Sequence, residues 1–265
     1  MTIDPAQLKK DLFPIPSYSD LIKRLQVPLS YSFVRKAYPH TMQEAQVFAQ
    51  RLLGDDPRQR YGAWLVYLQK TFNTLGAAGV KDYQDLVGRL GTEADLEAFA
   101  QNLGVPTGEI VGVLKYLLYW VLPGRKDLNQ LILATDTPRK ANNAILKKHG
   151  VRSNLDLLEQ GNSPAGRQAL AARTGLPLEA ITEMVHRADY SRMPWYNGKT
   201  ISYFIGAGYP TLELLAKADL QKLTADILSY GQSIGKNLKF GVEADSGGIV
   251  ARVLPRVVDN YVSSG

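Results

Sequence analysis

An all-α fold is predicted by three features of the sequence. Apolar residues recur at steps of three and four, which places them on one face of a helix; the clearest runs lie in residues 65–78, 96–103, 113–121 and 201–216. Alternating strand-like runs are rare, and the best of them is Lys239–Val253, with Gly247-Gly248 as its turn. The third feature is an internal repeat whose unit has helical spacing throughout.

Composition excludes several classes of protein. With 45% hydrophobic and 21% charged residues, the 265-residue chain is neither disordered nor collagen-like, and it is long enough for one to three domains. The absence of cysteine excludes a disulfide framework, thiolate zinc sites, iron–sulfur clusters and cysteine catalysis. It is compatible with a reducing compartment, and we expect a cytoplasmic protein.

No segment has the pattern of a membrane or targeting sequence. Residues 1–12 are charged and lack the apolar centre of a signal peptide. The most apolar stretch, Val111–Leu122, includes Lys115 and is too short to span a bilayer. We expect no membrane partner and predict a buried helix there, with Tyr116, Tyr119 and Trp120 in the core or between helices.

The internal repeat has a period of 71 residues. Residues 76–123 align without a gap on residues 147–194, with 12 of 48 positions identical, whereas average composition gives about three identities by chance. The identical pairs include Gly79/Gly150, Asp85/Asp156, Leu86/Leu157, Gly104/Gly175, Pro106/Pro177 and Tyr119/Tyr190. A shorter third version begins at Gly206-Ala207-Gly208-Tyr209.

Each repeat unit has the pattern of a set of helical hairpins. A glycine at the left-handed position ends one helix, and a proline in the first turn starts the next. We predict tandem hairpin units stacked into one elongated or two-lobed bundle. The division expected is an N-terminal helical extension (1–60), a first hairpin unit (61–130), and second and third units (131–265). The prolines of Phe13-Pro14-Ile15-Pro16 predict an extended arm.

The turn Met193–Thr200, followed by Ile201 through Phe204-Ile205-Gly206-Ala207-Gly208-Tyr209, resembles a helix-hairpin-helix module. Residues of about 131–262 are similar to a bacterial family known only as a domain of unknown function, and residues 60–130 carry a weaker version. That resemblance implies two hairpin units and a final helix at Leu254–Val262. It implies no activity, because none is assigned to the family.

The turns depart from helix-hairpin-helix modules that bind DNA. In those modules, turn glycines let backbone N–H groups approach a phosphate at a helix N-terminus. Here Trp195 and Asn197 occupy those positions, and Gly198 is displaced by one. Because asparagine tolerates the left-handed conformation, Asn197–Thr200 can still form such a cradle. The upstream turn, Thr137-Pro138-Arg139-Lys140, has no glycine.

Two functions are therefore kept open. Residues 139–199 contain ten Lys and Arg against five acids, which favours a nucleic-acid partner held by phosphate contacts. The first function is a non-enzymatic nucleic-acid-binding protein. Its contacts would be Arg139, Lys140, Asn197, Gly198, Lys199 and Thr200. The alternative is a protein-interaction scaffold that uses Trp195 and Tyr196. Trp195 could also staple one hairpin to the next.

No catalytic arrangement stands out. The chain shows no nucleophile–base pair, no metal-ligand spacing and no nucleotide loop, since Gly76–Gly79 and Gly206–Gly208 lack a preceding strand and a phosphate-binding lysine. Only three histidines are present, and we expect His149 and His186 at the surface or at helix ends. We therefore expect no enzyme activity, no cofactor and no metal.

Overall fold

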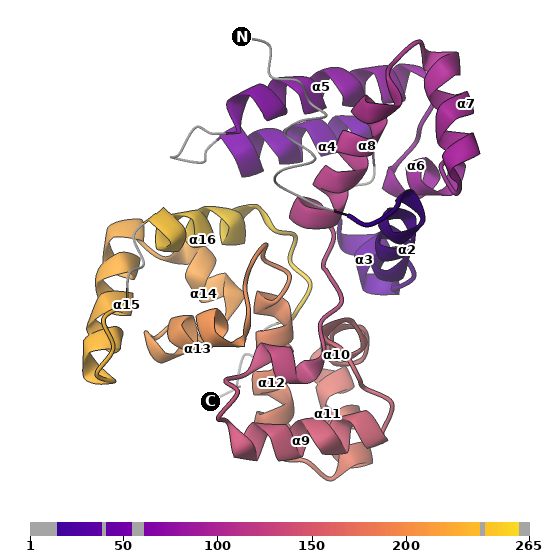
Figure 1. Cartoon of the computed structure of the whole chain (residues 1–265). Coiled ribbons are helices and arrows are strands. Elements are labelled where there is room, and N and C mark those ends of the chain that lie inside the picture. Colours follow the sequence, from indigo (N-terminus) through magenta and orange to yellow (C-terminus); the bar gives the residue numbers. More distant parts are fainter. Residues whose placement is uncertain (1–14, 39–40, 55–60, 239–241, 260–265) are drawn as a thin grey trace. The chain divides into compact units, whose positions relative to one another are not determined.

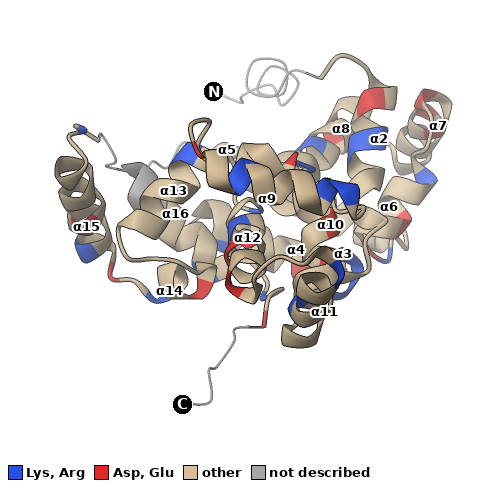
Figure 2. Ribbon diagram, turned by 90° about the horizontal axis from the view of Figure 1, so that it is seen from below, with Lys and Arg blue, Asp and Glu red and all other residues tan. Residues whose placement is uncertain are grey.

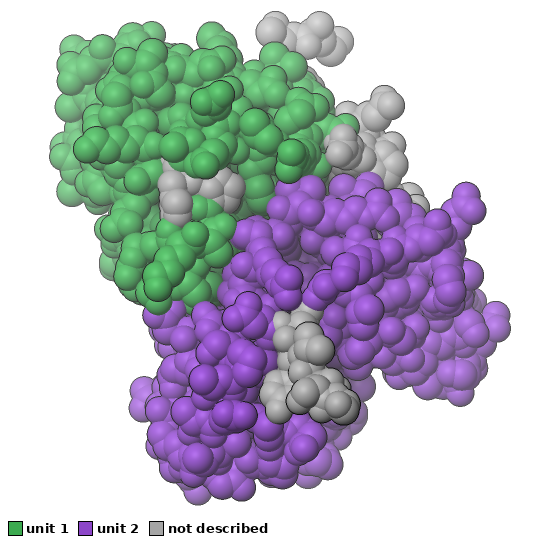
Figure 3. All heavy atoms as spheres, turned by 180° about the vertical axis from the view of Figure 1, so that it is seen from behind, with its two compact units in different colours: residues 1–124 green, residues 125–265 purple. Residues whose placement is uncertain are grey.

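The computed structural model describes residues 15–38, 41–54, 61–238 and 242–259, and the chain divides into two compact units, residues 1–124 and 125–265 (Figures 1 and 3). The described residues form helices and no β-strand, apart from an isolated antiparallel bridge between Asp127 and Ser153. The predicted all-α class is confirmed. Phe13 and Pro14 of the predicted arm lie outside the described residues, and the three-part division at residues 60 and 130 stays a prediction.

Unit 1 is built from seven described α-helices and two short π-helical segments. They are α2 (Tyr18–Leu29), α3 (Ser32–Ala37), α4 (Met42–Ala49), η1 (Gln50–Gly54), α5 (Gly62–Ala77), α6 (Tyr83–Arg89), α7 (Glu93–Leu103), α8 (Thr107–Tyr116) and η2 (Leu117–Val121). Helices α4 and α5 pack against each other, and α5 also packs against α8 (Figure 1).

The core of unit 1 is aromatic where α5 meets α8 and η2. The ring of Tyr116 lies edge-on to Trp64 at 5.8 Å and to Phe72 at 6.0 Å, and Tyr61 lies edge-on to Trp120 at 4.9 Å. Tyr116 and Trp120 are buried as predicted, whereas Tyr119 is half-buried. Such pairs add to the free energy gained by burying apolar area.

Unit 2 contains the residues singled out as candidate sites. Its elements are η3 (Leu128–Leu131, a 3₁₀ turn), α9 (Thr137–Lys148), α10 (Asn154–Gly161), α11 (Pro164–Thr174), α12 (Leu178–Tyr190), α13 (Gly198–Gly206), α14 (Leu212–Lys217), α15 (Leu220–Ser233) and α16 (Val242–Val253). Helix α12 is central: it packs against α10, α11, α13 and α14.

The predicted glycine C-caps are confirmed. Gly79, Gly104, Gly150, Gly175 and Gly208 have φ between 64° and 98°, the left-handed region where a Cβ is unfavourable. The valines after Gly79 and Gly150 are buried, and each donates its N–H to a carbonyl of the last helical turn at 3.0 Å. These bonds satisfy carbonyls that the helix itself leaves without a partner.

Helix bounds in the two units follow the sequence period. Helix α7 (Glu93–Leu103) and helix α11 (Pro164–Thr174) are displaced by 71 residues at both ends. Asp85 and Asp156 accept equivalent backbone N–H groups, from Lys81 at 2.9 Å and from Arg152 at 3.0 Å. The identical residues therefore hold equivalent helix starts.

Two predictions near the C-terminus are wrong. Val242–Val253 is helical, so Gly247-Gly248 is not a hairpin turn; residues 239–241 lie outside the described residues. A Cβ on Gly247 would collide with the Tyr196 hydroxyl, so this glycine serves close helix packing instead.

The final helix expected at Leu254–Val262 is absent from residues 254–259, and residues 260–262 are not described. That segment follows the surface of unit 2 because buried arginines bind its backbone. Arg192 donates to the Pro255 carbonyl at 3.0 Å and Arg167 donates to the Asp259 carbonyl at 2.8 Å.

Candidate interaction site at the turn between helices α12 and α13

The turn between α12 and α13, residues 191–197, is held at both ends by one half-buried lysine. The Lys126 ammonium donates to the Ser191 carbonyl at 2.8 Å and to the Tyr196 carbonyl at 2.6 Å. Asn154 donates its side-chain amide to the Ser191 hydroxyl at 2.9 Å. Burial lowers the pKa of Lys126 to about 8. These contacts fix the turn before any partner binds, and sequence reasoning missed Lys126 because it lies 65 residues from Ser191.

Trp195 occupies this turn in an unusual backbone conformation. Its φ is 70°, and it is the only non-glycine residue with a positive φ in the described part of the chain. Its side chain is 61% exposed. A bulky residue in the left-handed region is strained by about 1–2 kcal/mol. The turn thus keeps a glycine-like conformation where the sequence places tryptophan.

Tyr196 differs from its prediction as a partner-binding residue. It is buried, with its ring 5.3 Å from Phe204 and its hydroxyl against Gly247. Burial raises the pKa of Tyr196 above its ordinary value. Tyr196 therefore anchors the turn to the core, while the side chain of the preceding Trp195 is largely exposed.

The N-terminus of α13 is capped by its own chain. The side-chain oxygen of Asn197 accepts the N–H groups of Lys199 at 3.0 Å and of Thr200 at 3.1 Å. Asn197 is extended, with φ −122°, so the left-handed cradle expected at Asn197–Thr200 is not formed. Gly198 is buried, and a Cβ there would collide with the Ile132 backbone. These are the groups that would hold a phosphate in a helix-hairpin-helix module.

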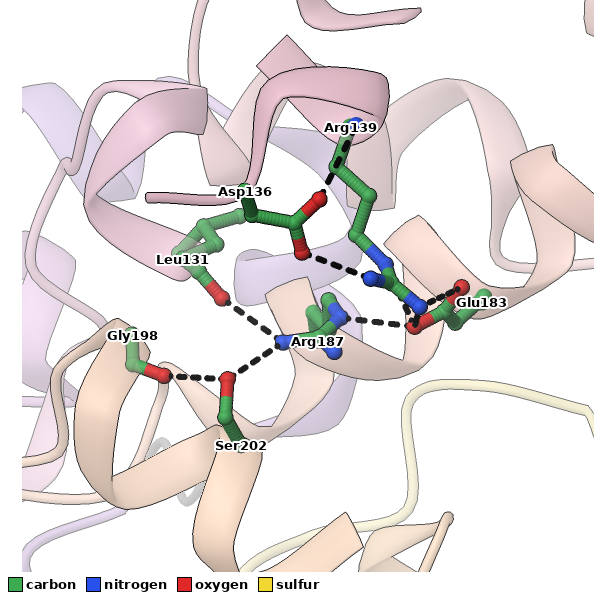
Figure 4. Close-up of polar contacts among 7 residues, drawn as sticks. All are labelled: Leu131, Asp136, Arg139, Glu183, Arg187, Gly198 and Ser202. Atoms are coloured by element: carbon green, nitrogen blue, oxygen red, sulfur yellow. Dashed lines mark hydrogen bonds and ion pairs between the residues drawn. The ribbon is translucent and has the colours of Figure 1, made fainter. Parts of the chain in front are cut away.

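The N-terminus of α9 is capped in the same manner, here by a carboxylate. Asp136 accepts the Arg139 N–H at 3.1 Å, and its other oxygen pairs with the Arg139 guanidinium at 2.6 Å. Arg139 also donates twice to the Glu183 carboxylate, at 2.8 and 3.0 Å. Arg139, predicted as a phosphate contact, thus forms two internal ion pairs (Figure 4).

Arg187 joins this ion-pair cluster to α13. It pairs with Glu183 at 3.0 Å and donates to the Leu131 carbonyl at 3.2 Å and the Ser202 hydroxyl at 3.1 Å; Ser202 in turn donates to the Gly198 carbonyl at 2.7 Å (Figure 4). Burial lowers the pKa of Arg187, although Glu183 opposes the shift. The network of ion pairs and hydrogen bonds therefore connects Arg139 with Gly198, two of the residues predicted to contact nucleic acid.

Glu183 is the carboxylate at the centre of the network. Burial raises its pKa, but hydrogen bonds and charges from Arg139 and Arg187 outweigh burial, so the pKa lies below its ordinary value. Glu183 and Arg187 are four residues apart on α12, a spacing visible in the sequence. Arg139 is 44 residues from Glu183, so its role required the fold.

Much of the positive charge that favoured nucleic acid is engaged inside unit 2. Of the ten basic residues between 139 and 199, six contact acidic, amide or carbonyl groups of the protein: Arg139, Lys147, Arg167, Arg173, Arg187 and Arg192. The four others, Lys140, Lys148, Arg152 and Lys199, are exposed. The Lys199 ammonium lies 5.8 Å from the Tyr203 ring. Basic and acidic segments are interspersed along the helices (Figure 2).

No metal-binding cluster is found where the structure describes the chain, since no group of three or more His, Asp or Glu side chains is placed to share an ion. No helix in the described ranges has the length and apolar character needed to cross a membrane. His149 caps the C-terminus of α9 and is exposed, as expected, but His186 is half-buried within α12.

Comparison with known proteins adds one match. No curated protein and no solved structure is detectably similar to this chain. Residues 138–239, which lie within the segment that resembles a family of unknown function, match the model of a family described as a domain of unknown function, DUF4332.

Proposed function

We propose that unit 2 is a non-enzymatic protein-binding module and that Trp195 is its anchor. The observation that carries the proposal is a tryptophan, 61% exposed, in a left-handed turn whose ends are fixed by Lys126. Strain and exposure both lower stability, and such features concentrate at functional sites. Tryptophan is enriched among residues that dominate protein-binding energy, and a fixed turn loses little entropy on binding.

The capping of both helix N-termini favours this function over phosphate binding. At α13 the N–H groups of Lys199 and Thr200 already donate to Asn197. At α9 the Asp136 carboxylate occupies the place where a phosphate would lie, and its charge repels an anion. A phosphate would have to displace these groups, which disfavours the hairpin type of nucleic-acid contact.

A second candidate is nucleic-acid binding through side-chain charges alone. Lys140, Lys148, Arg152 and Lys199 are exposed on unit 2, and the whole chain has a net charge of +6. Contacts of this kind are independent of sequence and weaken steeply with salt. The cytoplasmic location expected from the absence of cysteine suits either candidate.

We also propose that α5–α8 and α9–α12 are two copies of one helical-hairpin unit. Support comes from the 71-residue displacement of α7 and α11, and from the shared glycine caps at Gly79 and Gly150. In this proposal the copies keep a helix-hairpin-helix framework, while their turns have lost the phosphate-binding glycines.

The test is quantitative affinity capture with three proteins: wild type, Trp195→Gly, and the double variant Lys140→Glu/Lys199→Glu. We expect at least one protein recovered by wild type and by the double variant to be lost with Trp195→Gly. Equal recovery by all three contradicts the proposal. Labelled DNA and RNA in a salt series test the second candidate, which predicts micromolar binding with a steep salt slope that the double variant abolishes.

A further inference from the structure

We infer that a pocket between α12 and the C-terminal end of α13 binds small apolar molecules that carry a protonated amine. The pocket lies in unit 2 and has a volume of about 420 Å³. Its apolar walls are Leu178 on α12, with Ile205 and Pro210 across from it. It does not include Trp195, so this site is separate from the proposed protein-binding turn.

The size and lining of the pocket fit a small molecule. Ligand pockets typically have volumes of about 300–1,000 Å³ and combine apolar walls with a few polar groups that fix orientation. Here the polar groups are Glu179, Glu183 and His186, which lie on one face of α12 at steps of four and three residues. An apolar body can contact Leu178 and Ile205 while its polar end meets these groups.

The charged side chains that line the pocket favour a cationic ligand. Two carboxylates line the pocket, and no lysine or arginine does. Glu183 is already paired with Arg139 and Arg187 behind the wall, whereas Glu179 is exposed and makes no ion pair within the described residues. Glu179 therefore supplies the uncompensated negative charge, which attracts an ammonium group and repels a carboxylate.

His186 supplies an unused hydrogen-bonding atom. Its Nδ1 is buried and has no hydrogen-bond partner in the described part of the chain. Burial lowers the pKa of His186, with Asp189 opposing the shift and Arg167 adding to it. An imidazole nitrogen that carries no proton accepts a hydrogen bond from an N–H donor. Glu179 thus supplies the charge that attracts a ligand amine, and His186 supplies a further polar atom in the same pocket.

The experiment titrates the whole protein with three molecules of the same shape: phenethylamine, phenethyl alcohol and hydrocinnamate. Binding is followed by backbone amide chemical shifts. We expect saturable shifts centred on residues 178–186 and 205–210, with phenethylamine binding most tightly and hydrocinnamate least. Glu179→Gln should weaken phenethylamine about threefold or more and leave phenethyl alcohol unchanged. Glu213→Gln, a carboxylate of unit 2 outside this pocket, is the matched control and should change neither.

Three results would overturn the inference. One is hydrocinnamate binding as tightly as phenethylamine, and another is the absence of saturable shifts up to about 10 mM ligand. The third concerns Ile205→Trp, which should fill the pocket and abolish phenethylamine binding while the amide spectrum outside the pocket is retained. Unchanged phenethylamine binding by that folded variant places the ligand elsewhere.

Discussion

At the scale of single residues, Trp195 has the backbone conformation expected of glycine, and Gly198 has the one expected of other residues. Trp195 has the backbone conformation typical of glycine, with φ 70°. Gly198 has an ordinary helical backbone, and it is glycine because the Ile132 backbone occupies the place of a Cβ. The first residue is strained and largely exposed, and the second is required by packing, so substitutions should separate function from stability.

Trp195→Gly should be more stable than Trp195→Ala by about 1 kcal/mol, because glycine relieves the left-handed strain that alanine keeps. Both variants lose the indole, so both should lose the partner. Chemical denaturation of the two variants measures the difference. A glycine variant that is clearly less stable than the alanine variant would show that the turn is not strained in solution.

Gly198→Ala should destabilise unit 2 by about 2–3 kcal/mol, because the new methyl group meets backbone atoms of Ile132 that cannot rotate away. Gly88→Ala is the control: Gly88 lies within α6, and nothing lies within 4 Å of its added Cβ. That change should be neutral or stabilising by up to about 1 kcal/mol. Comparable destabilisation by both substitutions would contradict the packing role assigned to Gly198.

The sequence predicted residue roles well where local geometry decides them. Glycines at helix ends, such as Gly104 and Gly175, had to be left-handed whatever their tertiary contacts. The basic character of Arg139 predicted a solvent-facing phosphate contact, but Glu183 lies on another helix and neutralises it. Tyr196 follows an exposed tryptophan and is nevertheless buried against Phe204. Such contacts depend on the fold and have no local signal.

At the scale of elements, α12 organises unit 2. It contacts four other helices, contributes Glu183 and Arg187 to the ion-pair network, and forms one wall of the pocket with Glu179 and His186. The repeat predicted this helix, because Pro177 aligns with Pro106 and a proline near the first turn starts a helix. The glycines of α16 were mistaken for a turn because Gly247-Gly248 fits both a hairpin turn and a close helix contact. The side chains that lie against them, Tyr196 and Leu220, come from other parts of the fold.

Two titratable side chains of α12, Glu183 and His186, should make the stability of the protein depend on pH. The folded-state pKa of Glu183 is depressed, so its contribution is present above the ordinary glutamate pKa and is lost as pH falls through the lower folded value. The depressed pKa of His186 acts in the same sense at higher pH, with stability falling as pH drops below about 6.5. Melting temperatures from pH 8 to pH 3 should therefore decrease in two steps, an upper one from His186 and a lower one to which Glu183 contributes together with other carboxylates of lowered pKa, such as Asp136.

Glu183→Gln should lower the unfolding free energy at pH 7 by about 1–2 kcal/mol, a modest value because Glu183 is partly exposed while Arg187 is not. It should also flatten the lower of the two steps, and His186→Asn should flatten the upper one. If Glu183→Gln keeps the full acid-dependent decrease below pH 5, the carboxylate is not the group responsible.

At the scale of the whole molecule, the chain consists of two compact units, and each contains buried apolar residues. Trp64 and Trp120 lie in the core of unit 1, and Leu157 is fully buried in unit 2. A charge placed at Leu157 has no partner in that core. Leu157→Asp should abolish the cooperative unfolding of unit 2. Unit 1 should still unfold in one cooperative transition, which the fluorescence of its buried tryptophans reports.

Leu214→Asp is the matched control, because Leu214 is 46% exposed in the same unit and should tolerate the charge with a change below about 0.5 kcal/mol. Differential scanning calorimetry and tryptophan fluorescence during heating follow the unfolding of both variants. Wild-type melting of Leu157→Asp would show that the position is not in the core and would refute the repeat register at Leu86 and Leu157.

The affinity of wild type and of Trp195→Gly for the protein recovered by affinity capture tests the central claim most directly. A residue that anchors an interface contributes about 2 kcal/mol or more, which corresponds to a loss of roughly thirtyfold in affinity. We predict a loss of at least that size, with the thermal stability of the variant unchanged or higher. Equal affinity for wild type and variant would show that Trp195 is not the anchor, and the proposed function of unit 2 would then be wrong.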